Sequence, residues 1–140
     1  MSVEITVQLK GLVASLTHGP SKSPLRAVPP LDNGGDGSSF SPTDLLAASF
    51  ASCAVMTTAL VSAQEGLSFG DASAKVVKVM SPPPRRVESL ELVITMPAGT
   101  KPEQRARLEE IARGCPVARS LHPDVKALIR FEYPEDTGSK

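Results

Sequence analysis

The N-terminal quarter of the chain alternates apolar and polar residues with the period of a β-strand. Over residues 3–9 every second residue is apolar, which is typical of a strand with one face turned to a core. Gly11 interrupts the alternation, and two further short strands are predicted over residues 12–16 and 25–28. The intervening His-Gly-Pro-Ser at residues 18–21 favours a turn. The pattern therefore predicts three consecutive strands joined by short turns.

A glycine- and serine-rich segment, residues 29–39, separates these strands from the longest predicted helix. Ser41 is a suitable N-cap, and Pro42 suits the first helical position. Asp44 lies three residues after the cap, where a carboxylate favours the exposed N–H groups. The helix is expected to run to about Glu65, with no charged residue after Asp44 until that end. Because it has no face suited to water, we expect it to be buried nearly all round.

The second half of the chain begins with two predicted strands and a helix. Apolar and β-branched residues predict strands over residues 72–79 and 87–96, separated by a proline-rich turn. Thr100 and Glu103 have the spacing of a capping box, so they predict the start of a charged helix that ends at Gly114.

A short helix and a last strand complete the predicted order. Cys115-Pro116 marks the start of the short helix, since proline favours the first helical position. Residues 125–133 alternate as a strand. The order is β-β-β-α-β-β-α-α-β, and we expect a single α+β domain over residues 1–140 with a disordered tail from about residue 134.

Composition narrows the classes of partner. Lys plus Arg and Asp plus Glu both number 15, so there is no net charge to attract nucleic acid or an anionic membrane surface. The hydrophobic share of 41% and the charged share of 21% are typical of a globular domain. The first residues do not resemble a signal peptide, and the sequence does not suggest an apolar run of bilayer length. We therefore expect a cytoplasmic protein with neither a nucleic-acid nor a membrane partner.

Cys53 and Cys115 are the residues best suited to carry chemistry. Two cysteines are too few for a secreted disulfide framework, and with two histidines they show no metal-site spacing, so no metal is expected. Taken alone, Cys53 is most simply a core residue of the apolar helix. Cys115 changes this interpretation, because the first N–H groups of the short helix would lower its thiol pKa.

Activation of Cys53 would require a nearby cation, since it lies well beyond the first turn of its helix, where the helix dipole acts. The candidates in the N-terminal part are Lys10, Lys22 and Arg26. Arg26 is favoured because a guanidinium stays charged when it is partly desolvated. For each of the three, a solvated surface charge is the simpler interpretation.

Two other motifs are weaker. The glycine-rich segment lacks the order of a phosphate-binding loop, so it is best interpreted as an ordinary loop. His122 is a candidate base for a cysteine hydrolase, but a histidine at a helix end is more often a local cap.

Two segments of the chain resemble the OsmC/Ohr family of osmotically induced and organic-hydroperoxide-resistance proteins, and the order of elements agrees over nearly the whole chain. The resemblance is carried by Gly34-Gly35, by Ser41-Pro42-Thr43-Asp44-Leu45-Leu46-Ala47-Ala48 leading to Ala51-Ser52-Cys53, and by Cys115-Pro116-Val117 with the strand that follows.

This resemblance implies an OsmC-like fold, in which an antiparallel sheet surrounds a long buried central helix in an intertwined homodimer. It implies reduction of organic hydroperoxides without a cofactor, with Cys53 as the peroxidatic and Cys115 as the resolving cysteine. A dithiol or a redox protein would then restore the pair. Phe40, Phe50 and Met56 are the candidate apolar wall of the substrate pocket.

The chain departs from the family pattern at one position. Family peroxidases have a glutamate after the helix-start proline, where this chain has Thr43, and Asp44 follows one place later. One position is about 100° around a helix, so Asp44 is a displaced carboxylate, and Arg26 is the candidate activating cation. The alternative is a family member that binds a small apolar ligand or senses oxidants without efficient turnover.

Overall fold

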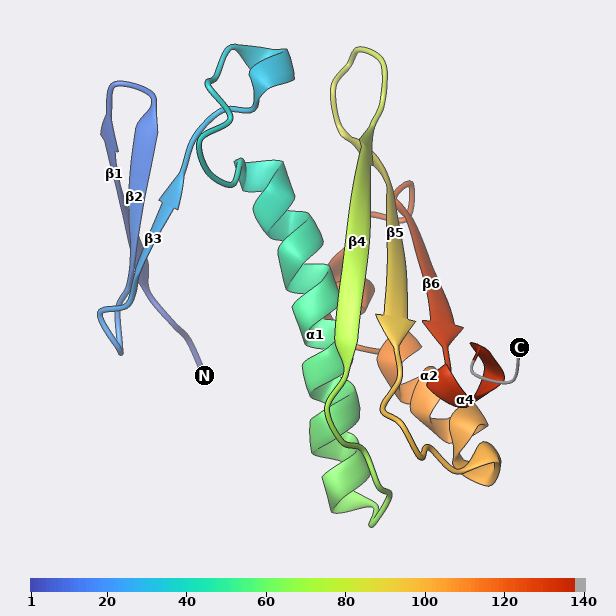
Figure 1. The fold of residues 1–140 in the computed structure, drawn as a ribbon. Coiled ribbons are helices and arrows are strands. Elements are labelled where there is room, and N and C mark those ends of the chain that lie inside the picture. The colour runs from blue at the N-terminus through green and yellow to red at the C-terminus, as the bar shows by residue number, and fades with distance from the viewer. Residues whose placement is uncertain (138–140) are drawn as a thin grey trace. The chain divides into compact units, whose positions relative to one another are not determined.

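The computed structural model describes residues 1–137 (Figure 1). The chain has two compact units, one over Met1–Leu46 and one that begins at Ala47. Each unit holds its own three-stranded sheet, and the two are described separately. The expectation of a single domain stays a prediction.

The first unit is an antiparallel meander, as the alternation predicted. Its strands are β1 (Ile5–Lys10), β2 (Val13–His18) and β3 (Pro24–Ala27). The turn between β1 and β2 begins with Gly11 at a φ of 61°, a conformation that glycine adopts without strain. The predicted turn after β2 is closed by the Ser21 N–H, which donates to Nδ1 of His18 at 3.2 Å.

The glycine-rich loop after β3 has a packing reason for its composition. It contains a 3-10 turn, η1 (Leu31–Asn33), and folds back so closely that a Cβ on Gly35 would lie 1.7 Å from the Pro29 carbonyl oxygen. Only glycine fits there. The Val28 N–H then donates to the Phe40 carbonyl at 2.9 Å, which fixes the two ends of the loop.

The second unit contains β4 (Ser73–Met80), β5 (Val87–Thr95) and β6 (Lys126–Glu132) in that order across its sheet. β4 and β5 pair antiparallel, as expected, but β5 and β6 pair parallel. The antiparallel prediction therefore does not extend to β6. The reason is the connection, because the helical segments after β5 return the chain to the end where β5 began.

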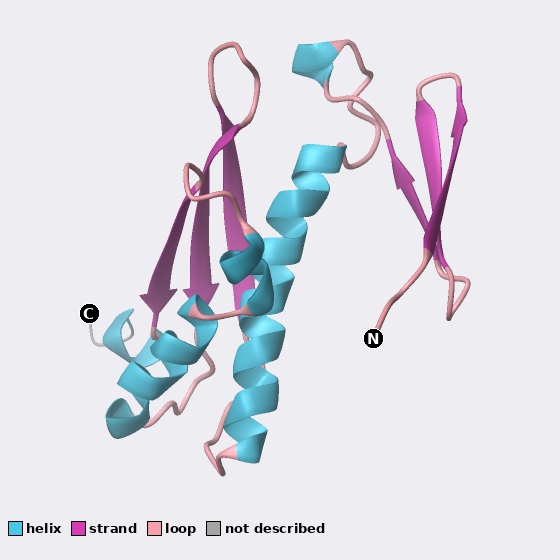
Figure 2. Cartoon of the chain, turned by 180° about the vertical axis from the view of Figure 1, so that it is seen from behind, coloured by secondary structure: helices cyan, strands magenta, loops and turns pink. Residues whose placement is uncertain are grey.

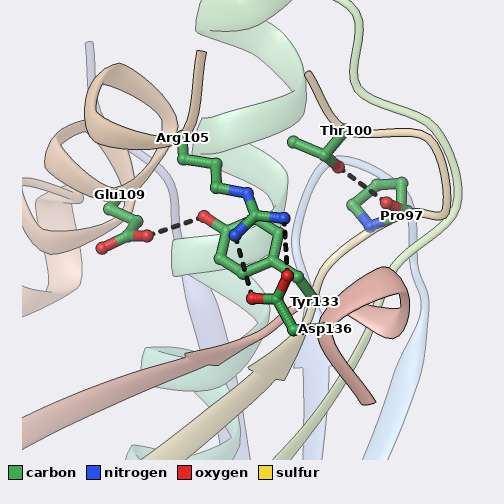
Figure 3. A network of polar contacts seen from close by, with 6 residues as sticks. All are labelled: Pro97, Thr100, Arg105, Glu109, Tyr133 and Asp136. Carbon is green, nitrogen blue, oxygen red and sulfur yellow. Dashed lines mark hydrogen bonds and ion pairs between the residues drawn. The ribbon is translucent and has the colours of Figure 1, made fainter. Parts of the chain in front are cut away.

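The connection from β5 to β6 carries η2 (Pro102–Gln104), α2 (Arg105–Arg113) and α3 (Pro116–Ser120). The predicted capping box at Thr100 does not form, because η2 begins at Pro102 with Lys101 as its N-cap and no side-chain cap. The Thr100 hydroxyl instead donates to the Pro97 carbonyl at 2.6 Å (Figure 3). The first turn is instead the 3-10 turn η2, whose proline needs no N–H partner.

The long helix α1 (Pro42–Gln64) lies with α2 and α3 on one face of the second sheet (Figures 1 and 2). Its buried positions recur at helical spacing and so share one side of the helix; they are Ala47, Phe50, Ala54, Thr58 and Ser62. The opposite side is open, with Met56 60% and Leu60 66% exposed. The prediction of burial all round is therefore not met within one chain.

By length and composition, α1 would also suffice to cross a bilayer. It has 23 residues, and its most apolar window has a mean hydropathy of 1.8, so the expectation that no such run exists was wrong. Core helices of soluble proteins meet the same criterion, and a polar cap at Ser41 and Asp44 fixes its start.

The end of the described chain is ordered by side chains of α2, where a disordered tail was predicted (Figure 3). α4 (Pro134–Thr137) forms a single turn, and the Arg105 guanidinium binds both carboxylate oxygens of Asp136 at 2.9 and 3.1 Å. Arg105 also stacks 3.8 Å from the ring centroid of Tyr133, whose hydroxyl donates to Glu109 at 2.7 Å. The part of the predicted tail at residues 138–140 lies outside the described residues.

Candidate redox site

The start of α1 is fixed by a reciprocal pair of hydrogen bonds. The Asp44 N–H donates to the Ser41 hydroxyl at 3.0 Å, and the Ser41 N–H donates to Oδ2 of Asp44 at 2.8 Å. This is the capping box that the spacing predicted, and it satisfies two backbone groups that a helix start leaves without partners.

Cys53 lies near the middle of α1 and is half-buried. Its sulfur lies 3.7 Å from the hydroxyl oxygen of Thr57, one turn further along the helix. Thr57 is itself half-buried, so its hydroxyl is a fixed neighbour of the Cys53 sulfur. The α1 start is too distant along the helix to act on this thiol through the helix dipole.

Cys115 is fully buried at the N-cap of α3, and Pro116 follows it in the first helical position. The Cys53 side chain is one of the groups that raise the pKa of the Cys115 thiol, although the two residues are distant in sequence. The fold therefore places the two cysteines within range of each other.

The pKa of the Cys115 thiol is raised above its ordinary value. Burial is the largest cause, and the adjoining Cys53 side chain also raises it, whereas the N–H groups of Ala118 and Val117 lower it. The helix start thus acts in the direction that the sequence predicted, but its effect is smaller than the cost of burying a thiolate. The predicted net lowering of the Cys115 pKa was wrong.

The two cysteines differ in their environments, since burial disfavours the Cys115 thiolate. Cys53 is also the more accessible of the two, being half-buried where Cys115 is fully buried. A reagent arriving from solvent therefore meets Cys53 first.

A cavity of about 290 Å³ opens beside the cysteine pair, between α1, α2 and α3. Thr57, which contacts Cys53, lies in its wall, as does Gly114, which precedes Cys115. The lining residues are Thr57, Val61, Arg107, Glu110, Ile111, Gly114 and Arg119.

Comparison with known proteins assigns the family. A model of the family described as OsmC-like protein matches residues 35–129, which include both cysteines. The chain belongs to the OsmC-like protein family. The resemblance predicted from the two cysteine motifs is confirmed.

Solved structures show the same OsmC-like fold. One from Psychrobacter arcticus 273-4, described as an osmotic stress induced and detoxification response protein, is 33% identical with a TM-score of 0.85, covering 91% of this chain and 94% of its own. An organic hydroperoxide resistance protein OsmC from Legionella pneumophila is 18% identical with a TM-score of 0.75, covering 94% and 97%. OhrB of Bacillus subtilis, an organic hydroperoxide resistance protein, is 16% identical with a TM-score of 0.68, covering 94% and 98%. No curated protein sequence matches the chain.

The predicted partners of Cys53 from the N-terminal part lie in the first unit of this OsmC-like chain. The Arg26 guanidinium donates to the Ser38 hydroxyl at 3.0 Å and lies near Asp36. The carboxylate of Asp44 accepts the Ser41 N–H of the cap. Lys10 and Lys22 are exposed, and Lys22 has a positive φ of 62° in the turn before β3. Their roles toward Cys53 stay predictions.

The three predicted pocket residues occupy different environments. Phe50 is fully buried in the core of the second unit, whereas Met56 on the same helix is 60% exposed. Phe40, in the first unit, is 50% exposed. Within one chain, the Phe50 side chain has no exposed surface, and the roles of all three residues toward a substrate stay predictions.

The two weaker motifs have structural explanations. His122 accepts the Asp124 N–H on Nδ1 at 3.0 Å and its side chain is 71% exposed, so it closes the turn after α3, and within the described part of the chain its ring makes no hydrogen bond to the carbonyls of the helix end. The cavity of about 340 Å³ at the glycine-rich loop is lined partly by Asp36, whose pKa is lowered chiefly by the Ser38 N–H. An ionised carboxylate disfavours phosphate there.

Thr57 and Arg119 are the site residues that sequence reasoning missed. The available signal was spacing. Thr57 lies four residues after Cys53, and Arg119 lies four residues after Cys115. Residues four apart lie on the same face of a helix. The cavity itself had no signal, because it is formed by three helices whose packing the sequence does not show.

Proposed function

We propose that this OsmC-like protein is a thiol-dependent peroxidase that reduces organic hydroperoxides to alcohols. The observation that carries the proposal is the proximity of the half-buried Cys53 to the buried Cys115, whose pKa it affects. Two of the structures that share its fold are named organic hydroperoxide resistance proteins, which supports the same substrate class.

The chemistry follows from the unequal environments of the sulfurs. The Cys53 thiolate attacks a peroxide oxygen, the O–O bond breaks, and the leaving alkoxide takes a proton to become the alcohol. Cys53 is then a sulfenic acid. The Cys115 sulfur attacks the Cys53 sulfur and expels water after protonation of the sulfenic hydroxyl, which leaves a disulfide. An external dithiol or redox protein reduces it and completes the cycle.

The thiol of Cys115 must lose its proton for the second step, and burial holds that proton in the reduced protein. Burial therefore lowers the reactivity of Cys115 in the reduced protein. This favours Cys53 as the peroxidatic and Cys115 as the resolving cysteine, in agreement with what the resemblance implied.

The working unit in this proposal is a homodimer. Exposed apolar side chains follow one face of α1, at Met56 and Leu60, and separately one face of β1, at Ile5, Val7 and Leu9, with exposed fractions from 57% to 72%. Such surfaces mark contacts with another chain, and a second copy offers the same two surfaces in return. Met56→Asp is expected to convert a dimer into a monomer in sedimentation equilibrium, and a wild-type chain that is monomeric would refute the proposal.

The second candidate is a family member that binds an apolar ligand or senses oxidants without efficient turnover. Thr43 occupies the position of the family glutamate, and the neighbouring Asp44 carboxylate is engaged in the helix cap, which favours this alternative. The two candidates differ in steady-state turnover.

The test of function is consumption of cumene hydroperoxide with a dithiol as reductant. The peroxidase proposal expects many turnovers per chain, complete loss with Cys53→Ser, and loss of dithiol-driven turnover with Cys115→Ser. If each wild-type chain consumes one hydroperoxide and then stops at every dithiol concentration tested, the sensor is favoured. Hydroperoxide consumption that survives Cys53→Ser would refute both.

A further inference from the structure

The cavity beside the cysteine pair carries charge that the proposed peroxidase chemistry does not use. Arg107 and Arg119 lie in its wall with a single carboxylate, Glu110. Its volume of about 290 Å³ is close to the lower end of the range for small-molecule sites, which is roughly 300 Å³.

Arg107 is committed to neighbours in the protein. Its Nε donates to Oε1 of Glu65 at 2.8 Å, and its two terminal nitrogens bind Glu65 and Glu110. Two carboxylates therefore neutralise this guanidinium and tie the end of α1 to α2. The same contacts occupy Glu110, the one acidic residue of the wall.

Arg119 is an exposed residue with one backbone partner and free donors. Its Nε donates to the Gly114 carbonyl at 2.9 Å, which holds the guanidinium near the end of α2. Within residues 1–137, its two terminal nitrogens have no hydrogen-bond or ion-pair partner. These nitrogens form the planar fork that matches a carboxylate.

Thr57 links the cavity to Cys53. Thr57 lines the cavity, and its hydroxyl oxygen lies 3.7 Å from the Cys53 sulfur. Arg119 and the neighbour of the Cys53 sulfur therefore belong to the same cavity wall.

We propose that this cavity binds the carboxylate of a reactant of Cys53 and that Arg119 sets this specificity. The inference rests on the proposed function only for the identity of that reactant, which is an anionic hydroperoxide or an anionic reducing thiol. Arg119 positions the reactant through its carboxylate and does not touch the reacting atoms.

The first experiment needs no peroxidase activity. 5,5′-Dithiobis(2-nitrobenzoate) carries carboxylates, and 4,4′-dithiodipyridine is an uncharged disulfide. In each case the Cys53 thiolate attacks one probe sulfur, the S–S bond breaks, and the second half leaves as a coloured thiolate or thione. The Arg119→Gln variant is expected to react about tenfold more slowly with the nitrobenzoate probe and at the wild-type rate with the pyridine probe.

Lys101→Gln is the matched control, because it removes one positive charge from an exposed residue outside the cavity. It is expected to leave the ratio of the two rates unchanged. Arg119→Lys keeps the charge without the fork and is expected to give an intermediate ratio. An equal change of the ratio in Lys101→Gln would overturn the proposal, since net charge alone would then explain it.

A measurement on the wild type covers the case in which Arg119→Gln does not fold. Benzoate is expected to slow the nitrobenzoate reaction by competition, and benzyl alcohol is not. If benzoate slows the nitrobenzoate reaction no more than sodium chloride at the same concentration, the cavity does not bind carboxylates.

Turnover then distinguishes the source of the carboxylate. One comparison uses linoleic acid hydroperoxide and its methyl ester, and the other uses 3-mercaptopropionate and 2-mercaptoethanol. Arg119→Gln is expected to raise KM for the acid in one comparison, with kcat unchanged. If Arg119→Gln changes KM equally for the acid and for its uncharged partner in both comparisons, the inference is overturned and the peroxidase proposal stands. If no hydroperoxide is turned over, only the peroxidase proposal is refuted.

Discussion

Substitution of Asp44 tests whether its carboxylate stabilises the fold or takes part in the reaction of Cys53. Asp44→Ala removes the 2.8 Å hydrogen bond from the Ser41 N–H and a negative charge from the start of α1. Loss of such a cap and of its charge costs about 1.5 kcal/mol, and the better helix propensity of alanine returns about 0.5 kcal/mol. The free energy of unfolding is therefore expected to fall by about 1 kcal/mol, or about 3 °C in melting temperature for a chain of this length.

The assay is urea unfolding at one protein concentration, together with the rate at which Cys53 reacts with iodoacetamide. Asp71→Ala is the matched control, because this exposed aspartate lies in a loop and is expected to leave stability unchanged. Ser41→Ala removes the other half of the capping box, so its cost and that of Asp44→Ala are expected to be non-additive. If Asp44→Ala left the unfolding free energy unchanged but slowed the Cys53 reaction by more than about tenfold, Asp44 would be part of the active site and the capping argument would fail.

Two further predictions concern the core and the buried thiol. Phe50→Ala is expected to lower the free energy of unfolding by about 3–5 kcal/mol in urea, because the ring is fully buried, and an unchanged midpoint would contradict its place in the core. The raised pKa of Cys115 means that the folded protein holds a proton that the unfolded chain releases near pH 8.5. The free energy of unfolding is thus expected to fall as pH rises above about 8.5, and this part of the fall is expected to be absent in Cys115→Ala under reducing conditions. Parallel profiles for the two proteins would show that burial does not disfavour the Cys115 thiolate.

The local elements of this fold were accessible from the sequence because local chemistry determines them. The alternation up to Leu9 predicts β1, and the Ser41–Asp44 spacing predicts the start of α1 with its reciprocal hydrogen bonds. Thr100 shows the limit of the same reasoning, since the helical turn begins one residue later than its spacing predicts, with Lys101 as the N-cap.

Properties that depend on several elements were not accessible in this way. The parallel pairing of β5 with β6 depends on how far the intervening helices carry the chain. The Cys115 pKa depends on a competition in which burial exceeds the helix start, and burial is set by residues distant in sequence. The sequence showed that α1 has no polar side, and the structure shows which side a single chain leaves open, at Met56 and Leu60.

The central claim is that Cys53 and Cys115 form a redox pair in which Cys53 reacts first. The most direct measurement treats the reduced protein with one equivalent of cumene hydroperoxide, counts the remaining thiols, and maps the disulfide by peptide mass spectrometry. The account predicts loss of both thiols with a Cys53–Cys115 link in the wild type, and a Cys53 sulfenic acid that a dimedone label captures in Cys115→Ser. Retention of both thiols, or oxidation at Cys115 with Cys53 intact, would contradict it.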